Sequence, residues 1–110
     1  MRPQTAMELW RFLTEVFPGF VADCTEEEIE ADTTLHFVMI DFAPYFSSNR
    51  EQFSEGQLRA LGLFINEAVS VDDNLENAVA TCFLEHLHQD GSYKALGPYL
   101  SALAKAKTHA

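Results

Sequence analysis

The chain has 110 residues, of which 47% are apolar, and it carries a formal net charge of −10 at neutral pH. Its size and its nine phenylalanines fit one globular domain over residues 1–110 and exclude an intrinsically disordered protein. The negative charge disfavours binding to nucleic-acid backbones and to anionic membranes, and no apolar run approaches the roughly 20 residues that span a bilayer.

The charge is distributed unevenly along the chain. All seventeen acidic side chains lie between Glu8 and Asp90, so residues 1–90, which contain four arginines, carry a net charge of −13. Residues 91–110 contain three lysines and no acidic side chain, which gives +3. A field of this polarity attracts basic proteins, cationic peptides or metal ions.

The N-terminal sequence and the use of cysteine indicate the cellular compartment in which we expect this protein. Residues 1–4 are not followed by the apolar segment and small-residue cleavage site of a signal peptide, so we expect a cytoplasmic protein. Cys24 and Cys82 stand far apart in the sequence. In a reducing compartment we interpret them as small apolar residues rather than as a disulfide.

The first expected helix begins at Thr5, because Thr5 and Glu8 have the spacing of a capping box. Apolar residues then recur at intervals of three and four, and the Pro-Gly pair at 18–19 ends the helix. Thr25 and Glu28 repeat the capping-box spacing. Either a short helix or a solvated loop follows there.

Residues 35–46 are the apolar centre of the sequence. Their β-branched and aromatic content also suits a strand, but the helical spacing of the apolar residues and the caps available at 32–34 favour a helix. Pro44 lacks an N–H and its ring clashes with the carbonyl of Ile40. We therefore expect a kink at this point, or two helical pieces that meet near Ala43.

Two further helices are predicted between residues 54 and 91. Ser54 and Gln57 form a third capping-box pair, and the helix that they open continues to about Ser70. The acidic connection at 71–74 then caps a helix that runs to Asp90-Gly91. Both helices have an apolar stripe that would face a common core.

The last helix is expected to begin at Gly97-Pro98, with Leu100 and Leu103 toward the core and Lys105 and Lys107 at its negative C-terminal end. The chain thus contains five or six helices with short connections, which place consecutive helices antiparallel. We therefore predict an all-α fold of antiparallel helical hairpins. An α-α superhelix of the HEAT or armadillo kind is favoured over a closed bundle.

Asp41 is the only carboxylate in residues 35–46, with His36 five residues before it and Tyr45 four residues after it. Burial would raise the pKa of Asp41 and suit it to act as a general base or ligand group. These three residues define a candidate pocket near Pro44. The structural alternative is that Asp41 accepts backbone N–H bonds where Pro44 breaks the helix.

Residues 23–32 contain the densest cluster of charge. The candidate partner-binding side chains in it are Glu26, Glu27, Glu28, Glu30 and Asp32. The functional interpretation is a docking site for a basic partner, and the structural interpretation is a solvated helix face.

Sequence motifs for catalysis or metal binding are absent. His86 and His88 diverge by about 200° on a helix, so they cannot share a metal ion. The chain has no EF-hand loop, no phosphate-binding glycine loop and no cysteine pairs for zinc. We therefore predict no metal site, no cofactor and no enzymatic activity.

Three stretches within residues 35–100 resemble a group of small, acidic, all-α bacterial proteins of uncharacterised function, some of which are similar to immunity proteins of toxin systems. The stretches are His36-Phe37 through Asp41 to Pro44-Tyr45; Leu61 to Glu67 with Asp72-Asp73, Asn77 and Thr81 to Leu87; and Leu96-Gly97-Pro98. The resemblance implies helical hairpins and carries over no catalytic residue.

These observations lead to two functional hypotheses. The first is a cytoplasmic protein-interaction module that binds a basic protein partner, such as a toxin, and binds neither nucleic acid nor membrane. The alternative is a small-molecule-binding or enzymatic domain that uses the pocket near Asp41 and His36.

Overall fold

The computed structural model describes residues 2–109, which form six α-helices and no strand. The helices are α1 (Ala6–Val16), α2 (Leu35–Asn49), α3 (Glu55–Ala68), α4 (Asn74–Cys82), α5 (Tyr93–Leu96) and α6 (Ala102–Lys107). Short 3₁₀ turns lie between them at Pro18–Ala22, Glu26–Glu28, Leu84–His86 and Gly97–Tyr99. The prediction of an all-α fold is confirmed. Within residues 2–109, no helix combines the length and the apolar character needed to cross a bilayer.

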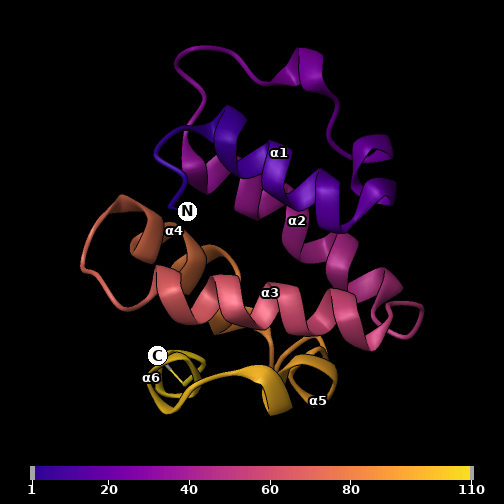
Figure 1. Cartoon of the computed structure of the whole chain (residues 1–110), viewed down its shortest axis with the longest axis vertical. Helices are drawn as coiled ribbons and strands as arrows, with labels where there is room; N and C mark the ends of the chain where they lie inside the picture. Colours follow the sequence, from indigo (N-terminus) through magenta and orange to yellow (C-terminus); the bar gives the residue numbers. More distant parts are fainter. Residues whose placement is uncertain (1, 110) are drawn as a thin grey trace.

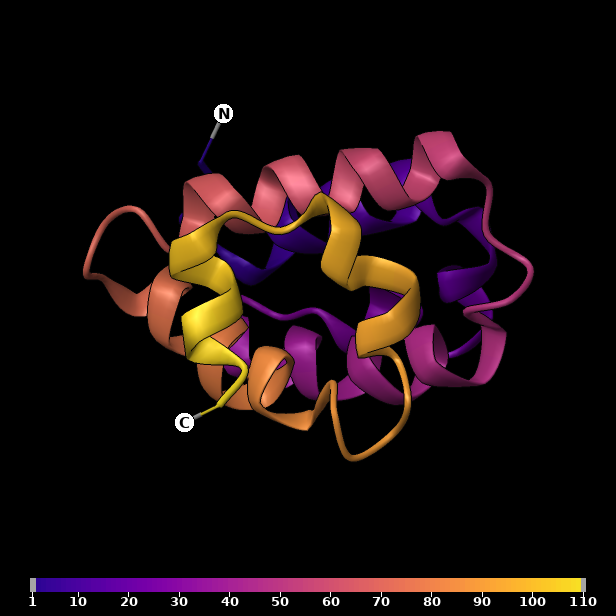
Figure 2. The same ribbon diagram turned by 90° about the horizontal axis from the view of Figure 1, so that it is seen from below.

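Helix α3 lies between the N-terminal and the C-terminal parts of the fold. Figure 1 shows α1 on one side of α3 and the short helices α5 and α6 on the other, and α3 packs against all three. Helix α2 lies behind α1 in this view and packs against both α1 and α4. Figure 2 shows α5 and α6 apart from each other, toward opposite ends of α3. The choice between a superhelix and a closed bundle stays a prediction.

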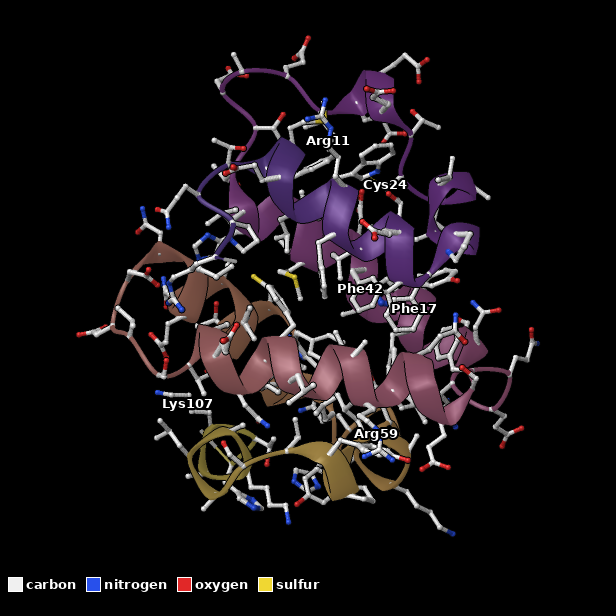
Figure 3. All side chains as sticks on the ribbon, in the orientation of Figure 1. Arg11, Phe17, Cys24, Phe42, Arg59 and Lys107 are labelled. Carbon is white, nitrogen blue, oxygen red and sulfur yellow. The ribbon has the colours of Figure 1, made fainter. Side chains whose placement is uncertain are left out.

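One hydrophobic core takes side chains from all six α-helices. Near its centre, the ring centroid of Phe42 lies 5.3 Å from that of Phe17 and 5.6 Å from that of Phe83. Figure 3 shows Phe17 and Phe42 side by side in the interior. Aromatic pairs at such distances contribute about 0.5–1.5 kcal/mol each beyond the burial of their area. The end of α1, the middle of α2 and the segment after α4 are therefore fixed to one another.

Two of the predicted capping boxes start helices where the sequence indicates. The Thr5 hydroxyl accepts a hydrogen bond from the backbone N–H of Glu8 at 3.2 Å, and the Glu8 carboxylate accepts one from Thr5 N–H. Ser54 and Gln57 make the same reciprocal pair at 3.1 and 2.9 Å. At Thr25 no such cap forms, and only a 3₁₀ turn interrupts the loop. The loop alternative is therefore correct for this segment.

Helix α2 runs through Pro44 without interruption, so the expectation of two helical pieces is wrong. Thr34 opens the helix by accepting a hydrogen bond from Phe37 N–H at 3.1 Å, as the caps at 32–34 predict. Pro44 is exposed to solvent. The carbonyl of Ile40, which loses its partner there, faces the same side, where water can satisfy it.

Helix α4 is shorter than predicted, because it ends at Cys82 instead of reaching Asp90-Gly91. Phe83 leaves the helical conformation, with φ −131° and ψ −62°, and its buried ring joins the aromatic core. Tertiary packing of this ring outweighs the local preference to continue the helix. A further helix, α5, forms after Gly91, whose φ is +80°.

The last helix also differs from the prediction. Gly97 ends α5, and α6 begins after Ser101, whose hydroxyl accepts a hydrogen bond from Ala104 N–H at 3.2 Å. Leu100 is buried as expected, but Leu103 is 50% exposed and does not face the core. Because the helix starts four residues later than predicted, its buried face is different, and Ala104 lies there instead. Lys105 and Lys107 occupy the last turn of α6, as predicted.

Candidate functional site

Residues 23–32, which we call the acidic loop, lie at one end of the long axis of the molecule, at the top of Figure 1. Glu26, Glu27 and Glu28 occupy its 3₁₀ turn, and Glu30 and Asp32 follow. All five candidate partner-binding side chains are exposed. The side chains are solvated, as the structural interpretation expects, but they lie on a loop with a single 3₁₀ turn instead of a longer helix.

The acidic loop is held against α1 by buried groups. The side chains of Cys24 and Ile29 are buried, and the indole N–H of Trp10 donates a 2.8 Å hydrogen bond to the carbonyl oxygen of Cys24. Figure 3 shows Cys24 beside α1, on the side of the acidic loop. A hydrogen bond in a buried position is costly to break, because both groups would be left without water or partner. The acidic loop therefore has a defined backbone position.

The carboxylates of the acidic loop take part in none of the ion pairs formed within residues 2–109. Those pairs are Arg2–Asp73 at 2.7 Å, Arg59–Glu55 at 2.6 Å and Lys107–Glu76 at 2.8 Å. The negative charge at this end of the molecule is thus not neutralised by a contacting side chain from the described part of the chain.

Cys24 and Glu28 of the acidic loop meet Asp41 of α2. The Cys24 sulfur and one carboxylate oxygen from each acid all lie within 4.8 Å of one another. Burial, followed by the charges of Asp41 and Glu28, raises the pKa of the Cys24 thiol to about 12. Burial also raises the pKa of Asp41, with Glu28 adding to the effect, whereas contact with the thiol acts in the opposite direction. We call these three residues the thiol–carboxylate cluster.

The prediction that Asp41 caps a broken helix is wrong, whereas a structural role through a buried hydrogen bond stays a prediction. Because α2 continues through Pro44, no backbone N–H is left without a helical partner beside Asp41, and none within residues 2–109 donates to its carboxylate. The side chain is half-buried without a helix-capping role. The expected rise of its pKa through burial is confirmed in direction.

The three residues of the predicted pocket do not meet. His36 faces away from Asp41, and its Nε2 lies 3.2 Å from Nδ2 of Asn77 in α4. Tyr45 is buried in the aromatic core, with its ring centroid 5.4 Å from that of Phe20, and burial raises its pKa. Residues five apart on a helix point in different directions, which explains why His36 and Asp41 are separated.

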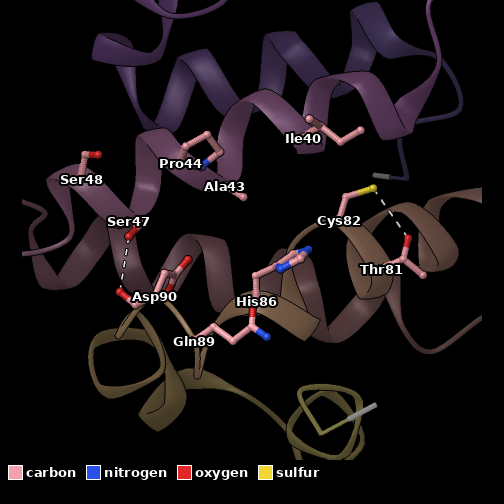
Figure 4. A pocket seen from close by; sticks show the side chains of 10 residues that line it. All are labelled: Ile40, Ala43, Pro44, Ser47, Ser48, Thr81, Cys82, His86, Gln89 and Asp90. Atoms are coloured by element: carbon pink, nitrogen blue, oxygen red, sulfur yellow. Dashed lines mark hydrogen bonds between the residues drawn. The ribbon is translucent and has the colours of Figure 1, made fainter.

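A cleft of about 630 Å³ does lie beside Pro44, between α2 and the segment that follows α4. Figure 4 shows that it opens between Ile40 and Pro44 on one side and Cys82 and His86 on the other. The remaining lining residues are Ala43, Ser47, Ser48, Thr81, Gln89 and Asp90. The position of the cleft agrees with the predicted pocket, but its residues do not include His36, Asp41 or Tyr45.

His86 and His88 lie apart, as predicted. His86 borders the cleft, whereas Nε2 of His88 lies 3.0 Å from the hydroxyl of Thr108. The His88 ring also stacks on Tyr93, at a centroid distance of 4.2 Å. The two imidazoles therefore cannot share a ligand.

Comparison with known proteins identifies the family but no activity. Residues 10–109 match a family model described as Domain of unknown function (DUF7674). The chain belongs to the DUF7674 family. The acidic loop, the thiol–carboxylate cluster and the cleft all lie inside the matched region. No curated protein and no solved structure matches the chain.

Cys24 is the residue of this DUF7674 domain that sequence reasoning overlooked. The sequence predicts a small apolar role for it, and it is indeed buried, but its sulfur lies beside two carboxylates. Glu28 follows at a spacing of four, which was a local signal. Asp41 comes from another element seventeen positions after Cys24, so no spacing rule connects it to the pair.

Proposed function

We propose that this DUF7674 domain is a protein-interaction module that binds a basic partner through the acidic loop. The observation that carries the proposal is that the five exposed carboxylates at positions 26–28, 30 and 32 lie in a fixed loop without an ion pair among the described residues. Like charges held close together repel one another, and a basic surface relieves that repulsion.

The distribution of charge over the molecule supports the same proposal. The acidic loop and the lysine-bearing helix α6 lie at opposite ends of the long axis in Figure 1, and Figure 3 places Lys107 at the α6 end. A basic partner is therefore attracted more strongly to the acidic loop than to the α6 end, where Lys107 is itself paired with Glu76. Steering of this kind accelerates association and weakens at high ionic strength.

The resemblance to immunity-like proteins suggests a narrower class of basic partner. Immunity proteins bind a toxin and block it, and a basic toxin surface would complement the acidic loop. We propose a basic toxin as the first partner to test. The DUF7674 domain would act on it by binding alone and not by catalysis.

The test compares two triple variants that change the net charge equally. Glu26→Lys, Glu27→Lys and Glu30→Lys reverse charge in the acidic loop, whereas Glu15→Lys, Glu51→Lys and Asp72→Lys reverse exposed charges elsewhere. Pull-down from lysate of the native host is measured at low and at high salt. We expect the wild type and the second variant to retain a basic protein at low salt, and the loop variant to lose it.

The proposal fails if the loop variant retains the same protein, or if the two variants lose it equally, since the effect would then follow net charge alone. It also fails if no basic protein is retained at low salt. Circular dichroism confirms that both variants fold, which is expected because every substituted side chain is exposed.

A second candidate function is small-molecule binding in the cleft beside Pro44. Its volume of about 630 Å³ falls within the range of about 300–1,000 Å³ that ligand pockets occupy, and it combines apolar walls with the imidazole of His86. Ile40→Trp would fill the cleft, and Leu63→Trp is the control on an exposed position of α3. If the cleft binds fragments, chemical shifts of His86 respond in the wild type and in the control but not in Ile40→Trp. A response in Ile40→Trp contradicts this candidate.

A further inference from the structure

We propose that Cys24, Glu28 and Asp41 form a binding site for a single zinc ion, or another divalent transition metal of similar softness. The three donor atoms, one sulfur and two carboxylate oxygens, lie within 4.8 Å of one another and come from both the acidic loop and α2. The site is separate from the cleft beside Pro44, and it shares only Glu28 with the proposed partner-binding surface.

The three donor atoms need to move only a short way to surround a zinc ion. Zn–S bonds of about 2.3 Å and Zn–O bonds of about 2.0 Å in a tetrahedron place the donors about 3.3–3.5 Å apart. The observed upper limit of 4.8 Å requires each side chain to move by about an ångström or less. Glu28 can make this movement because it is exposed on the loop, whereas Cys24 is fixed by its burial.

The Cys24 side chain provides an observation that is independent of the acidic residues. The thiol is 0% exposed and lies beside two carboxylates, although most buried cysteines lie among apolar groups. The thiol makes a hydrogen-bonding contact with the Asp41 carboxylate, so its sulfur already lies against one of the two oxygen donors. A thiol in such a place becomes a good ligand once a cation neutralises the carboxylates.

The chemistry selects the class of metal. A thiolate is a soft ligand and disfavours magnesium and calcium, while two carboxylates accept zinc or cobalt. Binding exchanges one proton for the metal: Zn²⁺ bonds to the sulfur, and the thiol proton is released to solvent. Two carboxylates and a thiolate carry three negative charges, so the occupied site keeps one negative charge.

The three protein ligands leave one coordination position for water or for another ligand. Cys24 lies on the inner side of the cluster and Glu28 on the exposed side, so the open position faces solvent. Trp10 acts as a positioning residue, because its indole N–H holds the carbonyl of Cys24 at 2.8 Å. A bound ion would connect the acidic loop to α2 and restrict the motion of the loop.

The experiment uses cobalt as a spectroscopic substitute for zinc on the reduced, full-length protein. Cobalt bonded to a thiolate gives a charge-transfer band in the near ultraviolet. We expect one equivalent of Co²⁺ to produce this band in the wild type and one equivalent of Zn²⁺ to abolish it. In weakly buffered solution, a pH indicator should record one proton released for each zinc bound.

Matched variants decide whether the band belongs to the proposed site. Cys24→Ser should lose the band, whereas Cys82→Ser, which removes the other cysteine, should keep it. Glu28→Gln should weaken cobalt binding more than about tenfold, since loss of even an outer-shell partner costs that much. Glu27→Gln on the same 3₁₀ turn should have no effect. Both glutamates are exposed, so these two variants remain folded.

Three results would overturn the proposal: no band in the wild type, a band that persists in Cys24→Ser, or equal weakening by Glu28→Gln and Glu27→Gln. The lysine variant used to test partner binding leaves Glu28 unchanged. It should therefore still bind cobalt through the same three ligands, so failure of the partner proposal and failure of the metal proposal are distinguishable.

Discussion

Asp73 and Asp41 are two half-buried aspartates of this protein with opposite surroundings. Asp73 precedes α4 and accepts hydrogen bonds from Nε and Nη2 of Arg2 at 2.9 and 2.7 Å, which are the main reason that its pKa falls to about 2. Asp41 has no basic partner within the described residues, and burial raises its pKa. A carboxylate that is paired with a base stabilises the fold, whereas one that is buried beside other acids reduces stability at neutral pH.

The contacts of Arg2 extend beyond Asp73. Its guanidinium also donates to the carbonyl oxygens of Glu67 and Ala68, both at 2.8 Å. The Ala68 carbonyl lies at the end of α3, where the helix itself provides no donor, whereas the Glu67 carbonyl also accepts from the backbone N–H and the hydroxyl of Ser70. Arg2 therefore joins the end of α3 to the start of α4. The thiol–carboxylate cluster has no comparable cation, which is why it is the better place to expect a ligand.

We expect the largest loss of thermal stability when the Arg2–Asp73 pair is broken. Arg2→Ala removes the partner of Asp73 and leaves the Ala68 carbonyl without its guanidinium donor, so we expect the Tm to fall by several degrees. Arg59→Ala is the matched control, because the Arg59–Glu55 pair is 60% and 70% exposed and such pairs contribute little. Thermal denaturation followed by circular dichroism measures both. Equal decreases for the two variants would contradict this interpretation of Arg2.

Replacing each of the two aspartates by asparagine should cause a smaller change of Tm, in opposite directions for Asp73 and Asp41. Asp73→Asn keeps a side chain that can cap α4 but loses the charge, so it should lower the Tm at neutral pH. Asp41→Asn removes a charge that burial penalises, so it should raise the Tm at neutral pH. The comparison would be wrong if both variants shifted the Tm in the same direction.

The pH dependence of these two variants should also differ. The pKa of Asp73 is about 2 in the folded protein and 3.8 in the reference state, so its stabilisation is present above 3.8 and lost as the pH falls toward 2. The pKa of Asp41 is raised, so its ionised form lowers stability at neutral pH, and that penalty disappears once the pH falls below 3.8. Melting curves at about pH 7 and about pH 3 should show the gain from Asp41→Asn only at the higher pH.

The local parts of this fold could be predicted from the sequence. The starts of α1 and α3 depend on pairs of residues three apart, Thr5 with Glu8 and Ser54 with Gln57, and both form as expected. Such pairs need no information about the rest of the chain. The same local reasoning fails at Thr25, where no side-chain cap forms and the chain makes only one 3₁₀ turn between the buried residues Cys24 and Ile29.

Features that depend on distant contacts could not be predicted. Helix α4 stops at Phe83 because that ring packs on Phe42 and Phe46, and Leu103 is exposed because α6 starts at a different residue from the one expected. The candidate site shows the same limit. The exposed carboxylates of the acidic loop follow from their density in the sequence, but the approach of Asp41 to Cys24 depends on how α2 packs beneath the loop.

The two ion pairs that involve the ends of the described chain converge on one place. Arg2 pairs with Asp73, immediately before α4, and Lys107 pairs with Glu76 in the first turn of that helix. A mechanical load applied between the two ends would therefore reach the first turn of α4 directly. It would separate these two ion pairs before it acted on the aromatic core, so the protein should yield to force at its ends first and retain α1, α2 and their phenylalanines longest.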